Sequence, residues 1–204
     1  MALQSGELDA AYGLPYARLS HYSEATYTIS SVETSRSFFA QMNYQTEALQ
    51  DEKVREAIAM GIDKDGFTKV LLEGNGTAAT GPFPSSFTFG DDTVTAPAYD
   101  PDKARELLEE AGWTDTDGNG YVDKNGEDLT LRWLTYPSRQ ELPLLAESVQ
   151  STLGDIGIKV EVNSTANHLD VLQSGEGDIF ARAFVWAPPG DPEYFFSTHC
   201  LDSS

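Results

Sequence analysis

The chain has 204 residues, of which 40% are hydrophobic, so it is long enough to bury one core or two small ones. It carries 33 acidic against 13 basic residues, for a formal net charge of -20. Nucleic acids and anionic lipids bind clusters of Lys and Arg, so this balance argues against both partners. It suits a soluble or a cation-handling protein, and solubility is the simpler explanation.

Cysteine content and hydropathy narrow the class further. The single cysteine, Cys200, excludes an internal disulfide framework and a cysteine-rich zinc site. No apolar run is as long as a membrane span, and no signal peptide opens the chain. The chain starts with "ALQSGELDAAYGLP" after Met1, which indicates the end of a helix followed by an apolar strand, and it stops at "STHCLDSS". We therefore expect an excised piece of a longer protein.

The first half of the chain predicts strands, then two helices and a long loop. Residues 27–44 are rich in β-branched and aromatic side chains, which indicates one or two strands. The apolar spacing in "DEKVREAIAMGI" predicts a helix with Asp51 as its N-cap. A second short helix should begin at its cap, Asp63, and end at Gly74. Gly, Pro, Ser and Thr then dominate residues 74–99 without periodicity, which indicates an irregular loop.

The second half alternates helices and strands. "DPDKARELLEEAGW" predicts a helix with Asp100 as its N-cap, Pro101 at its first position and Gly112 at its end. "LTLRWLTY" alternates like a strand, and "LPLLAESVQSTLGDIG" is an amphipathic helix that Gly157 closes. "IKVEVNS" predicts another strand, and a short helix around "HLDVLQSGEG" leads to a last strand in "DIFARAFVWAP". The alternation predicts an α/β layer architecture.

The segment "DTDGNGYVDKNGED" (residues 115–128) is similar to the loop of an EF-hand calcium site. Its ligand positions 1, 3, 5, 7 and 9 hold Asp115, Asp117, Asn119, Tyr121 and Asp123. Position 6 is Gly120, as the loop requires, but position 12 is Gly126 instead of a bidentate Glu, and a strand follows. The alternative is an Asx- and Gly-rich turn around a hairpin whose two-residue turn is Asn125-Gly126. Structural or incidental calcium and a plain turn both stay open, whereas calcium signalling is excluded by the single incomplete loop.

No catalytic pattern accompanies these elements. The histidines His21, His168 and His199 lie far apart without a motif around them, and His168 is expected to be a helix cap or a surface residue. The chain has no Gly-x-Ser-x-Gly elbow, no His-Glu-x-x-His pair and no phosphate-binding Gly-Lys-Ser/Thr loop. We therefore expect no enzyme. A hydrolase remains only if a missing part of the chain supplies the catalytic groups.

Several segments, taken together, resemble one family. They are "SGELDAAYGLP", "NYQTEALQDEKVREAIAMGIDKDGF", "AYDPDKARELLEEAGWTDTDGNGYVDKNGEDLTL", "DIGIKVEV" and "GDIFARAFVWAPPGDPEYFF". In consistent order over nearly the whole chain, they are similar to extracytoplasmic solute-binding proteins of the oligopeptide/dipeptide/nickel ABC-transporter class (family 5). The nickel-binding branch is the most similar. The resemblance implies one lobe of a type II periplasmic-binding-protein fold, with a central mixed sheet flanked by helices.

The same resemblance implies a domain organisation. Residues 1–204 would form a single α/β lobe, the excised second lobe of a two-lobed receptor that traps its ligand between the lobes. Residues 1–45 would hold strands near the inter-lobe crossover. Residues 178–204 would hold the return strand and the start of the crossover to the missing first lobe.

The implied function is that of the substrate-binding component of an ABC importer. Such a protein captures nickel-type metal complexes or peptides outside the membrane and delivers them to the permease membrane subunits. It would be periplasmic, or a cell-surface lipoprotein in a bacterium with one membrane, with no cofactor beyond possible incidental calcium. The alternative from another class is a calcium-stabilised extracellular interaction module.

The resemblance places the main ligand contact in "VWAPPGDPEYF". Trp186 would bring an aromatic face to the inter-lobe cleft, with core packing as the alternative. Pro189 stands where peptide-binding relatives carry an acidic residue for the α-amino group, so a buried peptide ammonium would lack a partner. The spacing from Trp186 to Asp191-Pro192 is instead similar to the nickel-binding branch. Asp191 is either a ligand contact or a turn residue.

Three further residues are candidates for the cleft. Strand periodicity puts positions 182, 184 and 186 on one face, so the guanidinium of Arg182 would approach the cleft and grip a carboxylate of a chelator or peptide. A surface or bracing role is the alternative for Arg182. Arg36 lies on the segment thought to cross between the lobes, and Tyr136 ends the strand "LRWLTY".

Overall fold

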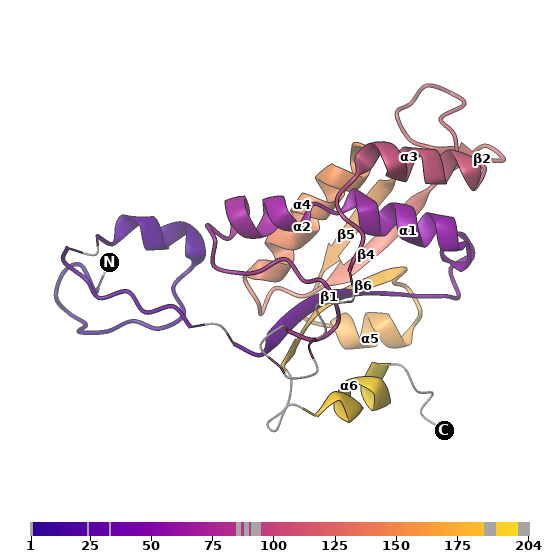
Figure 1. Cartoon of the computed structure of the whole chain (residues 1–204). Helices are drawn as coiled ribbons and strands as arrows, with labels where there is room; N and C mark the ends of the chain where they lie inside the picture. The colour runs from indigo at the N-terminus through magenta and orange to yellow at the C-terminus, as the bar shows by residue number, and fades with distance from the viewer. Residues whose placement is uncertain are drawn as a thin grey trace.

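A four-stranded mixed sheet forms the centre of the molecule (Figure 1), in a computed structural model that describes residues 2–23, 25–32, 34–84, 87, 90, 95–185 and 191–199. The strand order is β1-β6-β4-β5. The outer strand β1 (Arg36–Met42) pairs antiparallel with β6 (Ile179–Val185), whereas β4 (Thr130–Thr135) runs parallel to both β6 and β5 (Lys159–Ser164). The predicted α/β architecture with a mixed sheet is confirmed.

Helices cover both faces of this sheet. On one side lie α1 (Glu52–Gly61), α3 (Pro101–Glu110) and α4 (Glu141–Gly154), and on the other lie α5 (His168–Gln173) and α6 (Pro192–His199), as Figure 1 shows. The main core fills the first side. Its fully buried side chains include Leu49, Ile58, Leu108, Leu131, Trp133, Leu142, Leu153 and Ile158.

Aspartate caps begin three of the helices, as the sequence predicts. The carboxylate of Asp51 accepts a hydrogen bond from the backbone N–H of Lys53 at 2.9 Å. Asp63 accepts one from Gly66 at 2.8 Å, and Asp100 accepts one from Lys103 at 2.9 Å. Each bond satisfies a backbone donor that the first helical turn leaves unpaired.

The second short helix is present, but its geometry changes partway. It begins as α2 (Lys64–Gly66) and continues as the π-helical turn η3 (Phe67–Leu71). The hydroxyl of Thr68 donates to the carbonyl oxygens of Lys64 (3.0 Å) and Asp65 (3.2 Å), a local bond that competes with regular helical geometry. Gly74 follows with a φ of 78°, which supports its predicted place at the helix end.

The structure corrects the prediction for the N-terminal part. Among the described residues before 36 there is no strand, so the apolar strand expected after Met1 is wrong, and residues 27–44 give only β1. Turns and the short 3-10 helix η1 (Tyr16–His21) take their place, and a second 3-10 turn, η2 (Glu47–Gln50), precedes α1. Leu8 is 51% exposed, so this segment lacks the buried partner face that a strand pairing would require. In Figure 1 it projects beside the layered part.

The predicted hairpin after α3 is confirmed. It consists of β2 (Asp123–Lys124) and β3 (Glu127–Asp128), which pair antiparallel. Asn125 and Gly126 have φ angles of 58° and 80°, the two positive values that a type I′ turn needs.

A buried carboxylate fixes the alignment of the two central strands. Asp178, just before β6, is 4% exposed and accepts hydrogen bonds from Arg132 of β4 through Nε (2.9 Å), Nη2 (2.7 Å) and the backbone N–H (2.8 Å). The hydroxyl of Thr46 donates a fourth bond at 2.8 Å. The backbone groups of Asp178 add to this, because its N–H donates to the carbonyl of Arg132 and its carbonyl accepts from Asn43. The carboxylate therefore joins β4, β6 and the segment after β1.

Removing this carboxylate should destabilise the fold. Asp178→Ala leaves a guanidinium, a hydroxyl and a backbone N–H without their acceptor, so we expect the free energy of unfolding to fall by about 2–4 kcal/mol in urea titrations. Asp102→Ala is the matched control, because Asp102 pairs with Arg105 on the surface with 91% of its side chain exposed. That control should be almost neutral. An equal effect of the two substitutions would contradict the role given to Asp178.

The same experiment has a pH dependence of defined sign. Burial raises the pKa of Asp178, but the hydrogen bonds from Arg132 and Thr46 outweigh it and hold the pKa below the ordinary value of 3.8. The ionised carboxylate therefore contributes its full stabilisation above about pH 4, and this contribution is lost as the pH falls through the folded-state pKa. The gap in stability between wild type and Asp178→Ala should accordingly narrow in acid.

Candidate functional site

One edge of the central sheet gathers the strand ends that carry the predicted ligand-binding residues. Because β4, β5 and β6 are parallel, their carboxyl ends meet there, and antiparallel β1 brings its amino end to the same edge. The pair Arg36 and Val185 stands at this edge on β1 and β6. In open α/β sheets ligands bind outside the carboxyl ends of the strands. We therefore take this edge as the candidate site.

Tyr136 and Arg182 meet on the face of the sheet that α5 and α6 cover. The hydroxyl of Tyr136 accepts a hydrogen bond from the backbone N–H of Ala183 at 3.0 Å, which ties the end of β4 to β6. The guanidinium carbon of Arg182 lies 5.5 Å from the centre of the Phe180 ring, and the Tyr136 ring lies 6.3 Å from the same ring. Cation and phenol thus flank one aromatic side chain. The structure brings together two of the predicted ligand residues.

Arg36 approaches the same edge from the opposite face. It alternates in phase with Phe38 and Ala40, which pack against the main core, whereas Arg182 pairs across the strands with Phe39. Its Nε atom is buried and has no hydrogen-bond partner among the described residues. Arg36 and Arg182 therefore do not form one cationic pair, and each would present its charge on its own side of the sheet edge.

The neighbour of Arg36 on that face is a phenol. Tyr16 donates its hydroxyl hydrogen to Oε1 of Glu141 at 2.9 Å, at the start of α4. Burial and the bond to Glu141 raise the pKa of Tyr16, and the charge of Arg36 opposes that rise. No local pattern predicts this contact, because 125 residues separate its two partners.

The structure describes Asp191 but not Trp186, the two remaining predicted ligand residues. Asp191 is exposed, and its Oδ1 accepts the backbone N–H of Glu193 at 2.9 Å at the start of α6. The carboxylate of Asp191 thus bonds the first turn of α6, and a ligand contact of Asp191 stays a prediction. Trp186 and Pro189 lie outside the described residues.

Sequence reasoning missed the aromatic character of the face around Arg182. His168 is neither a cap nor a surface residue: it is half-buried, and its ring stacks on Tyr136 with centroids 4.3 Å apart. Phe184, two residues beyond Arg182, contacts Tyr194 and His199 of α6 at 5.3 and 4.9 Å. The alternation of Phe180 and Phe184 along β6 is the signal that could have found this face.

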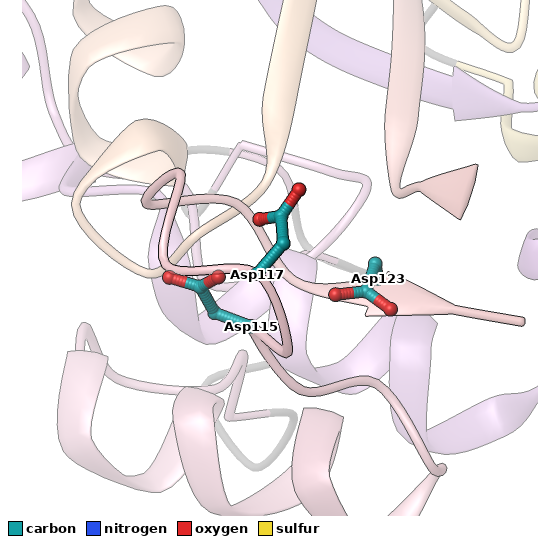
Figure 2. A group of neighbouring side chains, drawn as sticks. All are labelled: Asp115, Asp117 and Asp123. Carbon is teal, nitrogen blue, oxygen red and sulfur yellow. The ribbon is translucent and has the colours of Figure 1, made fainter. Parts of the chain in front are cut away.

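The aspartate-rich loop lies away from this edge, beside the hairpin (Figure 2). Asp115 accepts the backbone N–H groups of Gly118 (2.7 Å) and Gly120 (3.0 Å). Asp117 accepts that of Asn119 at 3.0 Å, and Asp123 accepts the N–H and the hydroxyl of Thr116. One oxygen each of Asp115, Asp117 and Asp123 lies within 4.8 Å of the others, so these carboxylates converge.

The donor set fits a calcium loop only in part. Asn119 turns its Oδ1 toward the N–H of Tyr121 at 2.8 Å, and position 12 is the hairpin glycine, which offers no carboxylate. Hydrogen bonds from the backbone and then the side chain of Thr116 lower the pKa of Asp123. The carboxylates thus close the loop by bonding its own donors. Calcium binding by Asp115, Asp117, Asn119, Tyr121 and Asp123 stays a prediction.

The chain is similar to known binding proteins along its whole length. It is 34% identical over 161 residues to the oligopeptide-binding protein AppA of Bacillus subtilis, a match that covers 77% of this chain and 30% of that protein. It is 26% identical over 206 residues to the nickel-binding periplasmic protein of Escherichia coli, covering 97% of this chain and 39% of that protein. The chain thus spans roughly a third of the length of these curated relatives.

Solved structures agree. The crystal structure of NikA from Brucella suis in complex with Fe(III)-EDTA superposes with a TM-score of 0.85 at 25% identity, over 98% of this chain and 41% of that one. The chain therefore has the type II fold of periplasmic binding proteins. The profile of the bacterial extracellular solute-binding proteins, family 5, middle region, matches residues 1–204, and the chain belongs to this family. These relatives are named as binding proteins, one for oligopeptides and one for nickel.

Calcium should have little effect on stability. A ligand stabilises a fold by RT ln(1 + [L]/Kd), so a site weaker than millimolar adds at most about 0.4 kcal/mol at 1 mM calcium. We expect the melting temperature with 1 mM calcium to match that with EDTA within about 2 °C. A larger rise that Asp117→Ala abolishes, and Asp102→Ala preserves, would establish a calcium site instead.

Proposed function

We propose that the chain is one lobe of the substrate-binding component of an ABC importer, which captures peptides or nickel-type metal complexes outside the membrane. The observation that carries the proposal is the sheet edge where Tyr136 and Arg182 meet on one face and Arg36 lies on the other, in a chain of the family 5 solute-binding proteins. The relatives support the ligand class, since they include proteins named for oligopeptide and for nickel binding.

The groups at this edge suit a small ligand with both charge and apolar surface. The half-buried guanidinium of Arg182, held over Phe180, offers a fork of donors to a carboxylate of a peptide or of a metal chelator. The aromatic rings beside it exclude water, which strengthens that interaction. Trp186, which follows β6 directly in the sequence, would add an indole face. No covalent chemistry is required of these residues.

Capture would then depend on a second lobe. In a two-lobed receptor the lobes move as rigid bodies, and a ligand that contacts both shifts the population toward the closed form. The present chain covers only 30–39% of its curated relatives, and we propose that the remaining length of the full protein supplies the opposite wall. The closed complex would be the form that the permease subunits accept.

We propose nickel-type complexes, rather than peptides, as the preferred ligand. Pro189, at the position where the resemblance expects an acidic residue, offers no charge for a peptide ammonium, so a peptide terminus would be held poorly. The carboxylate groups of a metal chelate need a cation instead, which this edge supplies through Arg182. Peptides remain the second ligand class, because several relatives are named for them.

The proposed location is extracytoplasmic, as the family's description indicates. Within the described residues, each helix falls short of the length and apolar character that crossing a bilayer demands. A calcium-stabilised interaction module finds no support among the relatives, and no contact described above favours a hydrolase.

Calorimetric titration tests the proposal. Because one lobe supplies only part of the contacts, this chain alone should bind a nickel–histidine complex or a tripeptide with a Kd weaker than about 1 mM. The complete protein should bind one of the two at least about a hundredfold more tightly. In that protein Arg182→Gln should weaken binding about tenfold or more, while Arg105→Gln on α3 should leave it unchanged. Micromolar binding by this chain alone, or a complete protein indifferent to Arg182→Gln, would contradict the proposal.

A further inference from the structure

Helix α6 is attached to the sheet through a cluster of rings. We call Phe39 of β1, Phe184 of β6, and Phe195 and His199 of α6 the α6 ring cluster. The His199 ring lies 5.2 Å from Phe39, 4.9 Å from Phe184 and 5.1 Å from Phe195, centre to centre. Phe195 in turn lies 5.9 Å from Phe39. The imidazole therefore sits at the middle of the contact between α6 and the sheet.

The polar groups of α6 make their hydrogen bonds within the helix and its cap. Glu193 donates its backbone N–H to Asp191, and the hydroxyls of Ser197 and Thr198 donate to the carbonyl of Tyr194, all within residues 191–199. The contacts with the sheet that position α6 are thus mainly apolar and aromatic. Such a contact is sensitive to a single charge placed inside it.

His199 has no partner for a second proton in this cluster. Its Nε2 is buried and makes no hydrogen bond among the described residues. A cation, Arg182 of β6, acts on this imidazole and disfavours its protonated form. On this face β1 presents Ser37, Phe39 and Gln41, which do not titrate, and the loop residue Phe83 packs its ring on Phe195.

The carboxyl groups of α6 do not offset that cation. Asp191 and Glu193 stand at the far end of the helix, and Tyr194 stacks its phenol on Phe184. Burial, and then the charge of Arg182, lower the pKa of His199 below its ordinary 6.5. A basic group whose pKa falls on docking favours the docked form while neutral, and it weakens docking once the pH drops below the pKa of the free group.

We propose that His199 makes the attachment of α6 to the sheet sensitive to pH: neutral imidazole holds the helix on the ring cluster, and protonation releases it. Docking is full above about pH 6.5 and weakens in mild acid. The release concerns the element that follows β6 after residues 186–190. That release would therefore affect the neighbouring segment with Trp186, to which the proposed function assigns a ligand contact. The conformational change itself does not require a ligand.

Hydrogen–deuterium exchange on this chain tests the proposal without ligand. Exchange rates of α6 amides, corrected for the intrinsic effect of pH, should rise at least about threefold relative to β4 amides between pH 7.5 and pH 5.0. His199→Phe keeps an aromatic ring and cannot be protonated, so its α6 amides should stay equally protected at both pH values. Arg182→Gln removes the repelling cation and should reduce the pH response without abolishing it.

Two histidine controls separate this residue from the others. His21→Gln on exposed η1 and His168→Phe beside Tyr136 should both keep the wild-type response. Wild-type α6 that is equally protected at both pH values would overturn the proposal, and so would a response that persists in His199→Phe. Should His199→Phe lose α6 protection already at pH 7.5, His199→Leu serves as the second non-titrating variant, with the same expected and contradicting results. Because no ligand is used, failure here leaves the binding proposal standing.

Discussion

The carboxylate of Asp178 is the constraint on which the arrangement of the site depends. It accepts three hydrogen bonds from Arg132 and one from Thr46, and Asp178 itself is buried, while the Arg132 side chain stays partly exposed. Burying a charge is unfavourable unless its partners are in place, so only one alignment of β6 against β4 satisfies it. That alignment sets Leu134 beside Phe180, and the alternation along both strands then carries Tyr136 and Arg182 to the same face.

The two faces of the central sheet have different roles. The side under α1, α3 and α4 holds the continuous aliphatic core around Trp133, and it supplies most of the stability through burial. The side under α5 and α6 is built from rings and two histidines and carries a cation, Arg182, among them. The first side holds the strands in place, while the second side carries aromatic rings and titratable groups at the edge that we propose as the ligand site.

The elements that the sequence predicted well are those with local causes. The caps Asp51, Asp63 and Asp100 bond backbone N–H groups two or three residues away, and Asn125-Gly126 makes a turn by its own φ angles. Periodicity predicted β4 and β6 because alternate residues of each strand are buried against the core. The strand prediction for the first 35 residues was wrong, because apolar composition alone does not make a strand when no partner strand lies beside it.

Site residues could be predicted from the sequence only where the alternation of side chains along one strand determines which face they occupy. Arg182 and Phe184 do share a face, as period 2 requires, and Tyr136 does end its strand beside them. The stacking of His168 on Tyr136, and of α6 on Phe39 and Phe184, joins residues far apart in the sequence. No local pattern encodes such contacts, because they arise only after the sheet has formed. For Trp186 the resemblance to the family remains the sole guide.

We propose that the sheet edge holding Arg36, Tyr136 and Arg182 is one wall of a ligand cleft. A crystal structure of the complete protein with a bound nickel complex or peptide tests it most directly. We expect ligand atoms within contact distance, about 4 Å, of the Arg182 and Tyr136 side chains, with a second lobe on the opposite side. A ligand bound elsewhere, with this edge covered by other parts of the same lobe, would contradict it.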